Sequence, residues 1–393
     1  MTRRQNDEGR TTVVAFTSHR PTEVVGPLRE SDLDAEVVCV AADGSFVDRC
    51  VETVRRTRSA LRRRDPDAVL LDCFEVMGVL VTLLSMAYRV PVVARLVGDT
   101  WLRFENAIRD ARAAGRYRRA AYYRLALSID EFVFARAIGF VVVSDALGEI
   151  VAERTSCPAD RIRTVPVPDP ALEATADGGA SAAGADGNRD AGPARKHGIE
   201  AETVLLTVTN LTYRAKLRGV DTVLDAVCPL LERDPGLAYV VAGGGEYADA
   251  LVRSLEERDL DPGVRSRIHT LGFVDDIGAL YELADVFVYV SFLDGYPRVV
   301  LEAQGAGLPV VANDAFGMRE QVAHGESGAL VDPSDADALR RELEALIADP
   351  ALRRQYGERG RDRLHRENSP AAVGRRLEEA LVSIIAKQRG ERR

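Results

Sequence analysis

Two acidic residues, Asp294 and Glu302, stand on either side of an expected helix start, with seven residues between them. The apolar run 286–290 is expected to be a β-strand that ends in a polar loop. Pro297 then opens a short helix, because its missing N–H would be unpaired at the first helical position anyway. The apolar run 308–312 follows at once, so the segment is expected to form a strand, loop, helix and strand of a parallel sheet.

The start of this helix is expected to bind an anion such as a phosphate, because open amide donors and the helix dipole both favour one there. Ligands of open α/β sheets also bind at this edge. Four backbone N–H groups are expected to point out of the helix start: those of Gly295, Tyr296, Arg298 and Val299. A carboxylate only accepts hydrogen bonds, so the acidic pair suits the vicinal hydroxyls of a ribose and a hexose. The alternative is that Asp294 caps the helix and Glu302 lies on a solvated face.

The same segment resembles the signature of the retaining glycosyltransferases of the GT-B fold, the group 1 or family 4-like enzymes. Their pattern reads Glu-Gly-Phe-(Gly/Pro)-x-x-x-Leu-Glu-Ala, followed by Gly-x-Pro-Val-Val-Ala. This chain has Asp-Gly-Tyr-Pro at 294–297, Leu-Glu-Ala at 301–303 and Gly-Leu-Pro-Val-Val-Ala at 307–312. One departure stands out, since Asp294 replaces the first glutamate of the family pair and is shorter by one methylene.

The resemblance also points to the stretch after the expected strand 203–208. Relatives have Gly-Arg-Leu-x-x-x-Lys-Gly there, and its two cations hold the donor diphosphate. In this chain Asn210 stands in place of the arginine, and we assign the lysine role to Lys216. Arg214 and Arg218 are rivals that could supply the second charge. The alternative is that this stretch is a basic surface loop.

Two further segments are expected near the nucleotide. The run Gly-Gly-Gly-Glu at 243–246, completed by Ala248, gives a GxGxxA pattern that on its own hints at a dehydrogenase. Relatives have a similar Gly-x-Gly here, so we interpret Gly245 as shaping the backbone near the nucleotide. The family's Leu-Gly-x-Val, beside which the base lies, is matched by the run that ends in Phe273 and Val274.

Two loop residues of the first half are expected on the acceptor side. His19 follows the first expected strand and Asp99 follows the strand 91–96. Both strands end at the sheet edge where ligands bind, so either residue could contact the transferred sugar or the acceptor. Many relatives have a histidine at the position of Val97, so no catalytic histidine is carried over. The alternatives are a solvated surface histidine and an aspartate that caps the next helix.

Residues 103–124 contain seven arginines against two acidic residues, interleaved with tyrosines, in a chain of net charge −9. Basic amphipathic helices bind anionic membrane surfaces through both their charge and their apolar side chains. Arg103 to Arg124 are therefore the expected contact with an anionic membrane surface or acceptor. The alternative is a solvated arginine face. No nucleic acid is expected, because the first half is near neutral and has no recognition motif.

The length of 393 residues is too great for one hydrophobic core. We expect residues 1–170 to be an N-terminal, acceptor-side Rossmann-like domain and 171–200 a flexible linker, too poor in large apolar residues to fold. Residues 201–372 would be the donor-binding domain and 373–393 a helix that crosses back to the first domain. The implied fold is α/β, GT-B, with two doubly wound domains facing each other across a cleft.

The chain is expected to be cytoplasmic, with a possible peripheral position on the inner face of the membrane. Its five cysteines are scattered, odd in number and without a CxxC pair, which is typical of reduced thiols. The first ten residues are polar and lack the apolar stretch of a signal peptide. The most apolar window, 76–88, is too short to cross a bilayer.

The resemblance implies a glycosyltransferase that moves a sugar, with retention, from a nucleoside-diphosphate sugar to a saccharide or lipid-linked acceptor. Lys216, Asp294 and Glu302 are the expected catalytic residues. Glu302 would hold the ribose hydroxyls, and Asp294 a hydroxyl of the transferred sugar. Positive charge and amides stabilise the leaving diphosphate, so no metal and no cofactor beyond the substrate are expected. The alternative, suggested by Asp294 and Asn210, is a catalytically degenerate nucleotide-sugar-binding subunit of a glycosylation complex.

Overall fold

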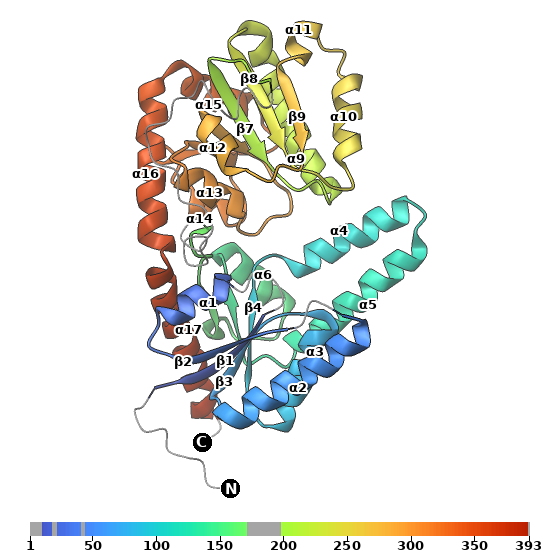
Figure 1. Ribbon diagram of the computed structural model, residues 1–393, viewed down its shortest axis with the longest axis vertical. Helices are drawn as coiled ribbons and strands as arrows, with labels where there is room; N and C mark the ends of the chain where they lie inside the picture. The colour runs from blue at the N-terminus through green and yellow to red at the C-terminus, as the bar shows by residue number, and fades with distance from the viewer. Residues whose placement is uncertain (1–9, 18–21, 41–43, 171–197, 392–393) are drawn as a thin grey trace. The chain divides into compact units, whose positions relative to one another are not determined.

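The computed structural model describes residues 10–17, 22–40, 44–170 and 198–391, and Figure 1 traces them. The chain divides into two compact units, each built around its own parallel sheet. The first unit comprises Met1–Pro168 with Glu367–Arg393, and the second comprises Asp169–Arg366. The expected linker lies almost wholly outside the described residues.

The sheet of the first unit has the order β2-β1-β3-β4-β5-β6, with every described pair parallel. The strands are β1 (Thr12–Thr17), β2 (Asp34–Cys39), β3 (Ala68–Asp72), β4 (Val92–Leu96), β5 (Gly139–Val142) and β6 (Ile162–Thr164). The central strands are buried along their whole length. That is why they read as continuous apolar runs instead of alternating ones.

Helices cover both faces of this sheet (Figure 1). Val13 and Ala15 of β1 pack with α1 and α17, whereas Val14 and Phe16 pack toward α2, α3 and α5. The helices of this unit are α1 (Thr22–Arg29), α2 (Phe46–Arg64), α3 (Glu75–Ala87), α4 (Thr100–Ala113), α5 (Tyr117–Phe134), α6 (Asp145–Arg154) and α17 (Pro370–Glu391), with a short 3-10 turn, Ala159–Arg161. Helices α4 and α5 form a hairpin that projects from the sheet.

The sheet of the second unit has the order β12-β11-β10-β7-β8-β9 and is also parallel throughout. Its strands are β7 (Thr203–Val208), β8 (Leu237–Ala242), β9 (Ile268–Gly272), β10 (Val286–Tyr289), β11 (Val310–Asn313) and β12 (Gly328–Val331). Consecutive strands run outward from β7 on one side and from β10 on the other. The strand order therefore reverses between β7 and β10, and ligands of doubly wound sheets bind at such a switch point.

Eight described helices accompany this second sheet. They are α9 (Arg214–Arg233), α10 (Ala248–Glu257), α11 (Pro262–Arg265), α12 (Gly278–Leu283), α13 (Arg298–Gly305), α14 (Met318–Gln321), α15 (Ala336–Ala348) and α16 (Pro350–Asn368). The predicted strand, loop, helix and strand at 286–312 are confirmed as β10, α13 and β11. Pro297 is the N-cap of α13 in an extended conformation, so the helix begins one residue later than predicted.

Candidate functional site

Lys216 lies buried on the first turn of α9, the helix that follows β7, so the alternative of a basic surface loop is wrong for this residue. Gly219, one turn further on, has no side chain to separate α9 from the end of β10. A Cβ atom at Gly219 would lie 2.0 Å from the carbonyl oxygen of Val290. This close approach brings Lys216 to the loop that follows β10 in the same unit.

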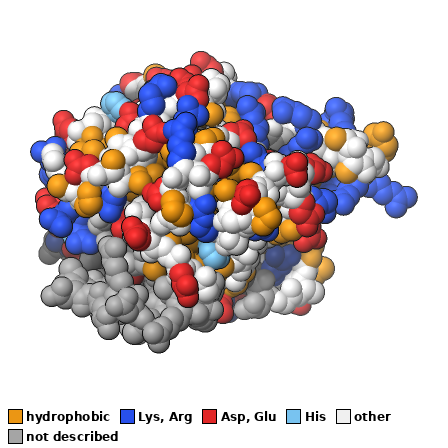
Figure 2. Space-filling model, turned by 90° about the horizontal axis from the view of Figure 1, so that it is seen from above, with side chains coloured by type: hydrophobic (Ala, Val, Ile, Leu, Met, Phe, Trp, Pro, Cys, Tyr) orange, Lys and Arg blue, Asp and Glu red, His pale blue; other side chains and the backbone are white. Residues whose placement is uncertain are grey.

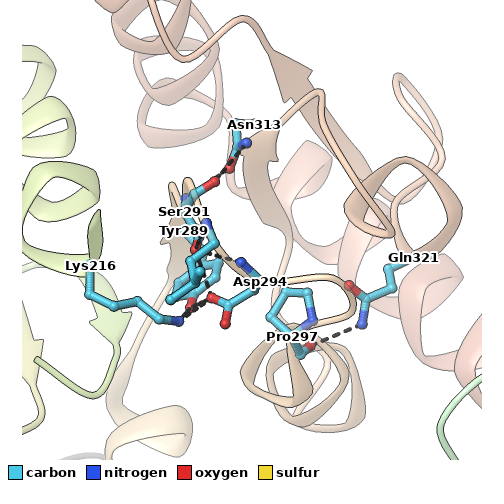
Figure 3. A network of polar contacts seen from close by, with 8 residues as sticks. Lys216, Tyr289, Ser291, Asp294, Pro297, Asn313 and Gln321 are labelled. Carbon is cyan, nitrogen blue, oxygen red and sulfur yellow. Dashed lines mark hydrogen bonds and ion pairs between the residues drawn. The ribbon is translucent and has the colours of Figure 1, made fainter. Parts of the chain in front are cut away.

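The Lys216 ammonium and the Asp294 carboxylate form an ion pair at this point (Figure 3). Tyr289, the last residue of β10, joins them, because its hydroxyl accepts a hydrogen bond from Lys216 Nζ at 2.7 Å and donates one to Asp294 Oδ2. Ser291 Oγ donates a further hydrogen bond of 2.7 Å to Asp294 Oδ2. The side chain of Lys216 is buried, and that of Asp294 is 24% exposed. Asp294 can therefore still be reached from solvent.

The loop that carries Asp294 is held from both ends. The amide of Asn313, at the end of β11, bonds the backbone of Ser291, accepting from its N–H at 2.9 Å and donating to its carbonyl at 3.1 Å. Gln321 donates to the carbonyl of Pro297 at 2.9 Å. Since these side chains are buried, the bonds fix the loop conformation at the start of α13.

The charges of this network set the ionisation of its members. Burial by itself would raise the pKa of Asp294, but Lys216 and the hydrogen bonds from Tyr289 and Ser291 outweigh it and hold the pKa below its usual range. Burial and the nearby Asp294 carboxylate raise the pKa of Tyr289 well above its usual value. Asp294 is thus a carboxylate and Tyr289 a neutral phenol at neutral pH. Asp294 is not the cap of α13, since its carboxylate is bound to Lys216.

Glu302, which lies on α13, has a different partner from Asp294. The hydroxyl of Tyr281, on α12, donates a hydrogen bond of 2.9 Å to Glu302 Oε2. Burial and the Glu302 carboxylate together raise the pKa of Tyr281 well above its usual value. Glu302 is partly buried and its carboxylate is held by Tyr281, and its contact with a ribose stays a prediction.

The rival basic residues are placed differently from Lys216. Arg218, Arg214 and Asn210 are all exposed, and only the guanidinium of Arg218 lies near the loop of Asp294, 3.8 Å from the ring centroid of Phe292. Arg218 therefore remains beside the ion pair without joining it. Its position is compatible with a second charge for a diphosphate, which stays a prediction for all three residues.

The predicted nucleotide-side glycine has a conformation that demands glycine. Gly245 has φ +148°, and a Cβ there would lie 2.4 Å from the backbone carbon of Leu211. The loop after β8 is thus pressed against the loop after β7. Phe273 is 81% exposed, and Val274 is partly buried against the core. The contact of Phe273 and Val274 with a base stays a prediction.

The remaining predicted residues of the helix start lie close together. The carbonyl of Gly295 accepts from the N–H of Gly317 at 2.7 Å, and Tyr296 is buried. Arg298 and Val299 are the first two residues of α13. The contact of their backbone amides with a phosphate stays a prediction.

Of the two acceptor-side residues, His19 lies outside the described residues. Asp99 is the N-cap of α4, and its side chain accepts from the N–H of Leu102 at 2.9 Å. Burial is the main cause that raises the pKa of Asp99. The capping interpretation of Asp99 is therefore correct, and an acceptor contact stays a prediction.

Five polar residues of the site were not predicted from the sequence: Tyr281, Tyr289, Ser291, Asn313 and Gln321. The tyrosines carried a usable signal, because a tyrosine inside an apolar run is buried and its hydroxyl then needs a partner. Ser291 and Asn313 carried no such signal, because the hydrogen bonds between them depend on how strands β10 and β11 align.

The projecting hairpin of α4 and α5 is basic and partly apolar at its surface. Arg109, Arg112 and Arg118 are exposed and form no ion pair within the described residues. Among the tyrosines and leucines of α5, Tyr117 is 71% exposed and Leu125 62%. Figure 2 shows the blue side chains gathered along this arm, with hydrophobic ones near its end.

Two features are absent from the residues that the structure describes. No cluster of three or more His, Cys, Asp or Glu side chains there is arranged to hold a metal ion. None of the described helices combines the length and the apolar character needed to span a bilayer.

Both halves of the chain match known protein families. Residues 194–363 match the family "Glycosyl transferases group 1", and residues 1–168 match the "Glycosyl transferase 4-like domain". The lipopolysaccharide core biosynthesis glycosyltransferase LpsE of Rhizobium meliloti is 33% identical over 44% of this chain and 47% of its own. A GDP-mannose-dependent phosphatidylinositol monomannoside mannosyltransferase of Mycolicibacterium smegmatis is 31% identical over 42% of this chain and 44% of its own. The matching region thus spans about half the length of these relatives.

The likeness to solved structures extends further along the chain. A crystal structure of Anabaena HepE in complex with UDP and glucose has a TM-score of 0.68 and 16% identity. It covers 95% of this chain and 100% of the other. At that identity the likeness concerns the fold alone, and the predicted α/β class with two doubly wound GT-B domains is confirmed.

Proposed function

Since the chain belongs to the glycosyltransferases that join a 4-like domain to a group 1 domain, we propose that it moves a sugar from a nucleoside-diphosphate donor to a saccharide or lipid-linked acceptor. The anomeric configuration is retained in this proposal. The observation that carries it is the ion pair of Lys216 and Asp294 beside the switch point between β7 and β10. A cation, a carboxylate and a helix start meet there, as a sugar diphosphate requires.

In the proposed complex each group has one task. Lys216 contacts the diphosphate and stabilises the charge that develops as it leaves, with Arg218 nearby and the first amides of α13. Asp294 accepts a hydrogen bond from a hydroxyl of the transferred sugar, and Glu302 from the ribose. Since fixed positive charge acts on the leaving group, the proposed reaction needs no metal. Transfer in EDTA at the rate seen with Mg²⁺ would support this, and loss of transfer in EDTA would contradict it.

A donor panel tests the proposal directly. The purified chain is mixed with UDP, GDP, ADP and their sugar derivatives, and its thermal midpoint is measured. A ligand at 100 times its dissociation constant adds about 2.7 kcal/mol to the free energy of unfolding. We expect one base to stabilise the protein and its sugar nucleotide to be turned over. Binding without turnover of any donor would instead favour the nucleotide-sugar-binding subunit, and no binding would refute both functions.

We further propose that the α4–α5 hairpin contacts an anionic membrane surface, where a lipid-linked acceptor would be presented. The support is the charge of Arg109, Arg112 and Arg118, which no acidic side chain of the described residues neutralises. The exposed Tyr117 and Leu125 supply the apolar contact. Arginine charge attracts anionic lipid by about 1 kcal/mol per residue near the surface.

Vesicle sedimentation separates this contact from a solvated arginine face. The full chain should pellet with vesicles of phosphatidylglycerol and phosphatidylcholine, and less with phosphatidylcholine alone. A variant with Arg109, Arg112 and Arg118 changed to glutamine should lose this preference, whereas the control Arg341→Gln, an exposed arginine of the second unit, should keep it. Equal sedimentation of all three proteins would contradict the proposed contact.

A further inference from the structure

The hydroxyl of Tyr289 touches both members of the ion pair and nothing in the proposed chemistry uses it. Tyr289 ends β10, next to the strand order reversal, and its side chain is 2% exposed. A buried tyrosine hydroxyl needs hydrogen-bond partners. Here the partners include the two predicted catalytic groups, Lys216 and Asp294, beside the buried side chains of Thr209 and Ser291.

The donors and acceptors of the three groups match one another. A lysine ammonium has three N–H donors and no acceptor. Lys216 Nζ directs one donor to Tyr289 Oη at 2.7 Å and another to Asp294 Oδ2. Its side chain contacts no other hydrogen-bond acceptor within the described residues. Since two of the three N–H groups are bonded, the orientation of the third N–H is set by the tetrahedral geometry of the ammonium.

We propose that Tyr289 is a positioning residue of this site, which fixes the ammonium of Lys216 so that its third N–H points at the leaving diphosphate. The inference rests on the proposed function. It requires Tyr289 to be a neutral phenol that donates to Asp294 while it accepts from Lys216, and the burial of its hydroxyl keeps it so.

Because Tyr289 acts through Lys216, the geometry predicts which kinetic constant should change when the hydroxyl of Tyr289 is removed. Without the hydroxyl, the ammonium keeps Asp294 but can rotate about that single bond. The third N–H is then no longer pre-oriented toward charge that develops only in the transition state. We therefore expect kcat to fall by a large factor and KM for the donor to change little, because the ground-state contacts of the nucleotide remain.

The test compares Tyr289→Phe with Tyr239→Phe in the full chain. Tyr239 is a matched control, because it is a fully buried tyrosine on β8 whose hydroxyl bonds Thr207 at 2.9 Å and reaches neither Lys216 nor Asp294. We expect Tyr289→Phe to lower kcat about tenfold, with less than about threefold change in KM, and Tyr239→Phe to leave both unchanged. A tenfold loss corresponds to about 1.4 kcal/mol of transition-state stabilisation.

A double-mutant cycle with Lys216→Met decides whether the effect passes through the lysine. If it does, the double variant should have the same kcat as Lys216→Met alone. If the two residues act independently, the fold-reductions in kcat of the two single variants should multiply in the double variant. The positioning role would be overturned if the two substitutions lowered kcat by independent factors, or if Tyr289→Phe and Tyr239→Phe were equally active. In either case, turnover by the wild-type protein would leave the proposed function intact. Failure of the proposed function would be seen in the wild-type protein, as no turnover of any donor, and would overturn both.

Discussion

The ammonium of Lys216 is bonded to the carboxylate of Asp294, although 78 positions of the chain separate the two residues. The bond joins the helix after β7 to the loop after β10, which are neighbouring strands of the second sheet. It makes two predicted catalytic groups structurally dependent on each other. A substrate that binds to Lys216 or to Asp294 therefore meets both residues of the ion pair.

The first prediction concerns the stability of this pair against pH. Asp294 has a lowered pKa in the folded protein, so its contribution to stability is present above its unfolded pKa of about 4 and is lost as pH falls through the folded value. In Lys216→Met the burial of Asp294 dominates and raises its pKa. The wild type should therefore exceed the variant by about 1–3 kcal/mol at pH 7 and by much less below pH 4.

Urea denaturation of both proteins between pH 3 and 8 measures that difference. The double variant Lys216→Met with Asp294→Asn removes both charges and should recover part of the stability at pH 7. A difference between wild type and Lys216→Met that is independent of pH would show that the pair does not control the ionisation of Asp294.

The second prediction concerns Glu302. Changing Glu302 to Ala removes the expected ribose contact and should lower transfer at least tenfold, about 1.4 kcal/mol or more. Changing its partner, in Tyr281→Phe, keeps the carboxylate and removes the hydroxyl that bonds it at 2.9 Å and the Val299 carbonyl at 3.4 Å. The tyrosine variant should therefore lose less activity than Glu302→Ala. Steady-state rates with the preferred donor measure both, and near-normal transfer by Glu302→Ala would refute the assignment.

The third prediction uses the close approach at Gly219. Alanine there would place a Cβ 2.0 Å from the carbonyl oxygen of Val290, so α9 must move away from β10. We expect Gly219→Ala to lower the free energy of unfolding by about 2–3 kcal/mol and to displace Lys216, with a loss of transfer.

Gly148→Ala is the control for this glycine. Gly148 also lies within a helix, but the nearest atoms to its Cβ would be 3.5 Å away, which is ordinary contact. Alanine in a helix is favoured over glycine by up to about 1 kcal/mol, so this variant should be as stable as the wild type or more so. If Gly219→Ala behaved like the control in thermal unfolding, α9 would not be held by this contact.

The fourth prediction concerns Asp130 of α5, which is fully buried and accepts a hydrogen bond of 2.6 Å from the backbone N–H of Glu75, at the start of α3. Burial raises its pKa to about 6. A raised carboxyl pKa favours the protonated form in the folded state. The stability that this provides is present below pH 4 and lost as pH rises through 6, by about 3 kcal/mol.

Asp130→Asn keeps an oxygen that can accept from Glu75 and cannot ionise. The stability of this variant relative to the wild type should therefore increase between pH 4 and pH 7, as urea denaturation at each pH would measure. Parallel stability curves for the two proteins would contradict an ionisation of Asp130 in this range. Glu75 has φ +55°, so its backbone is held in a strained conformation at this contact.

Much of the second sheet could be predicted from the sequence alone. The run 286–312 was predicted as strand, loop, helix and parallel strand, and β10, α13 and β11 confirm it within about two residues. Buried parallel strands are continuous apolar runs, and Pro297 marks the beginning of the helix between them. These signals act over a few neighbouring residues, so they can be read before any fold is known. The boundaries were less certain, since helix ends depend on local hydrogen bonding.

The family resemblance identified Lys216, Asp294 and Glu302 but not the residues that hold them. Tyr289 reads as one more apolar residue of a strand, yet its hydroxyl lies between Lys216 and Asp294. No motif in the sequence pointed to Asp130, yet it is buried and accepts a hydrogen bond from the backbone at the start of α3.

The sequence by itself therefore determined the strand, helix and parallel strand at 286–312, the two-domain α/β class, and which charged residues stand near the expected sheet edge. The tertiary structure alone decided that Lys216 binds Asp294, that Tyr289 joins them and that Glu302 is held by Tyr281. The physical reason is that backbone preference is local, whereas a buried polar group takes whichever partner the packed strands bring within hydrogen-bond distance.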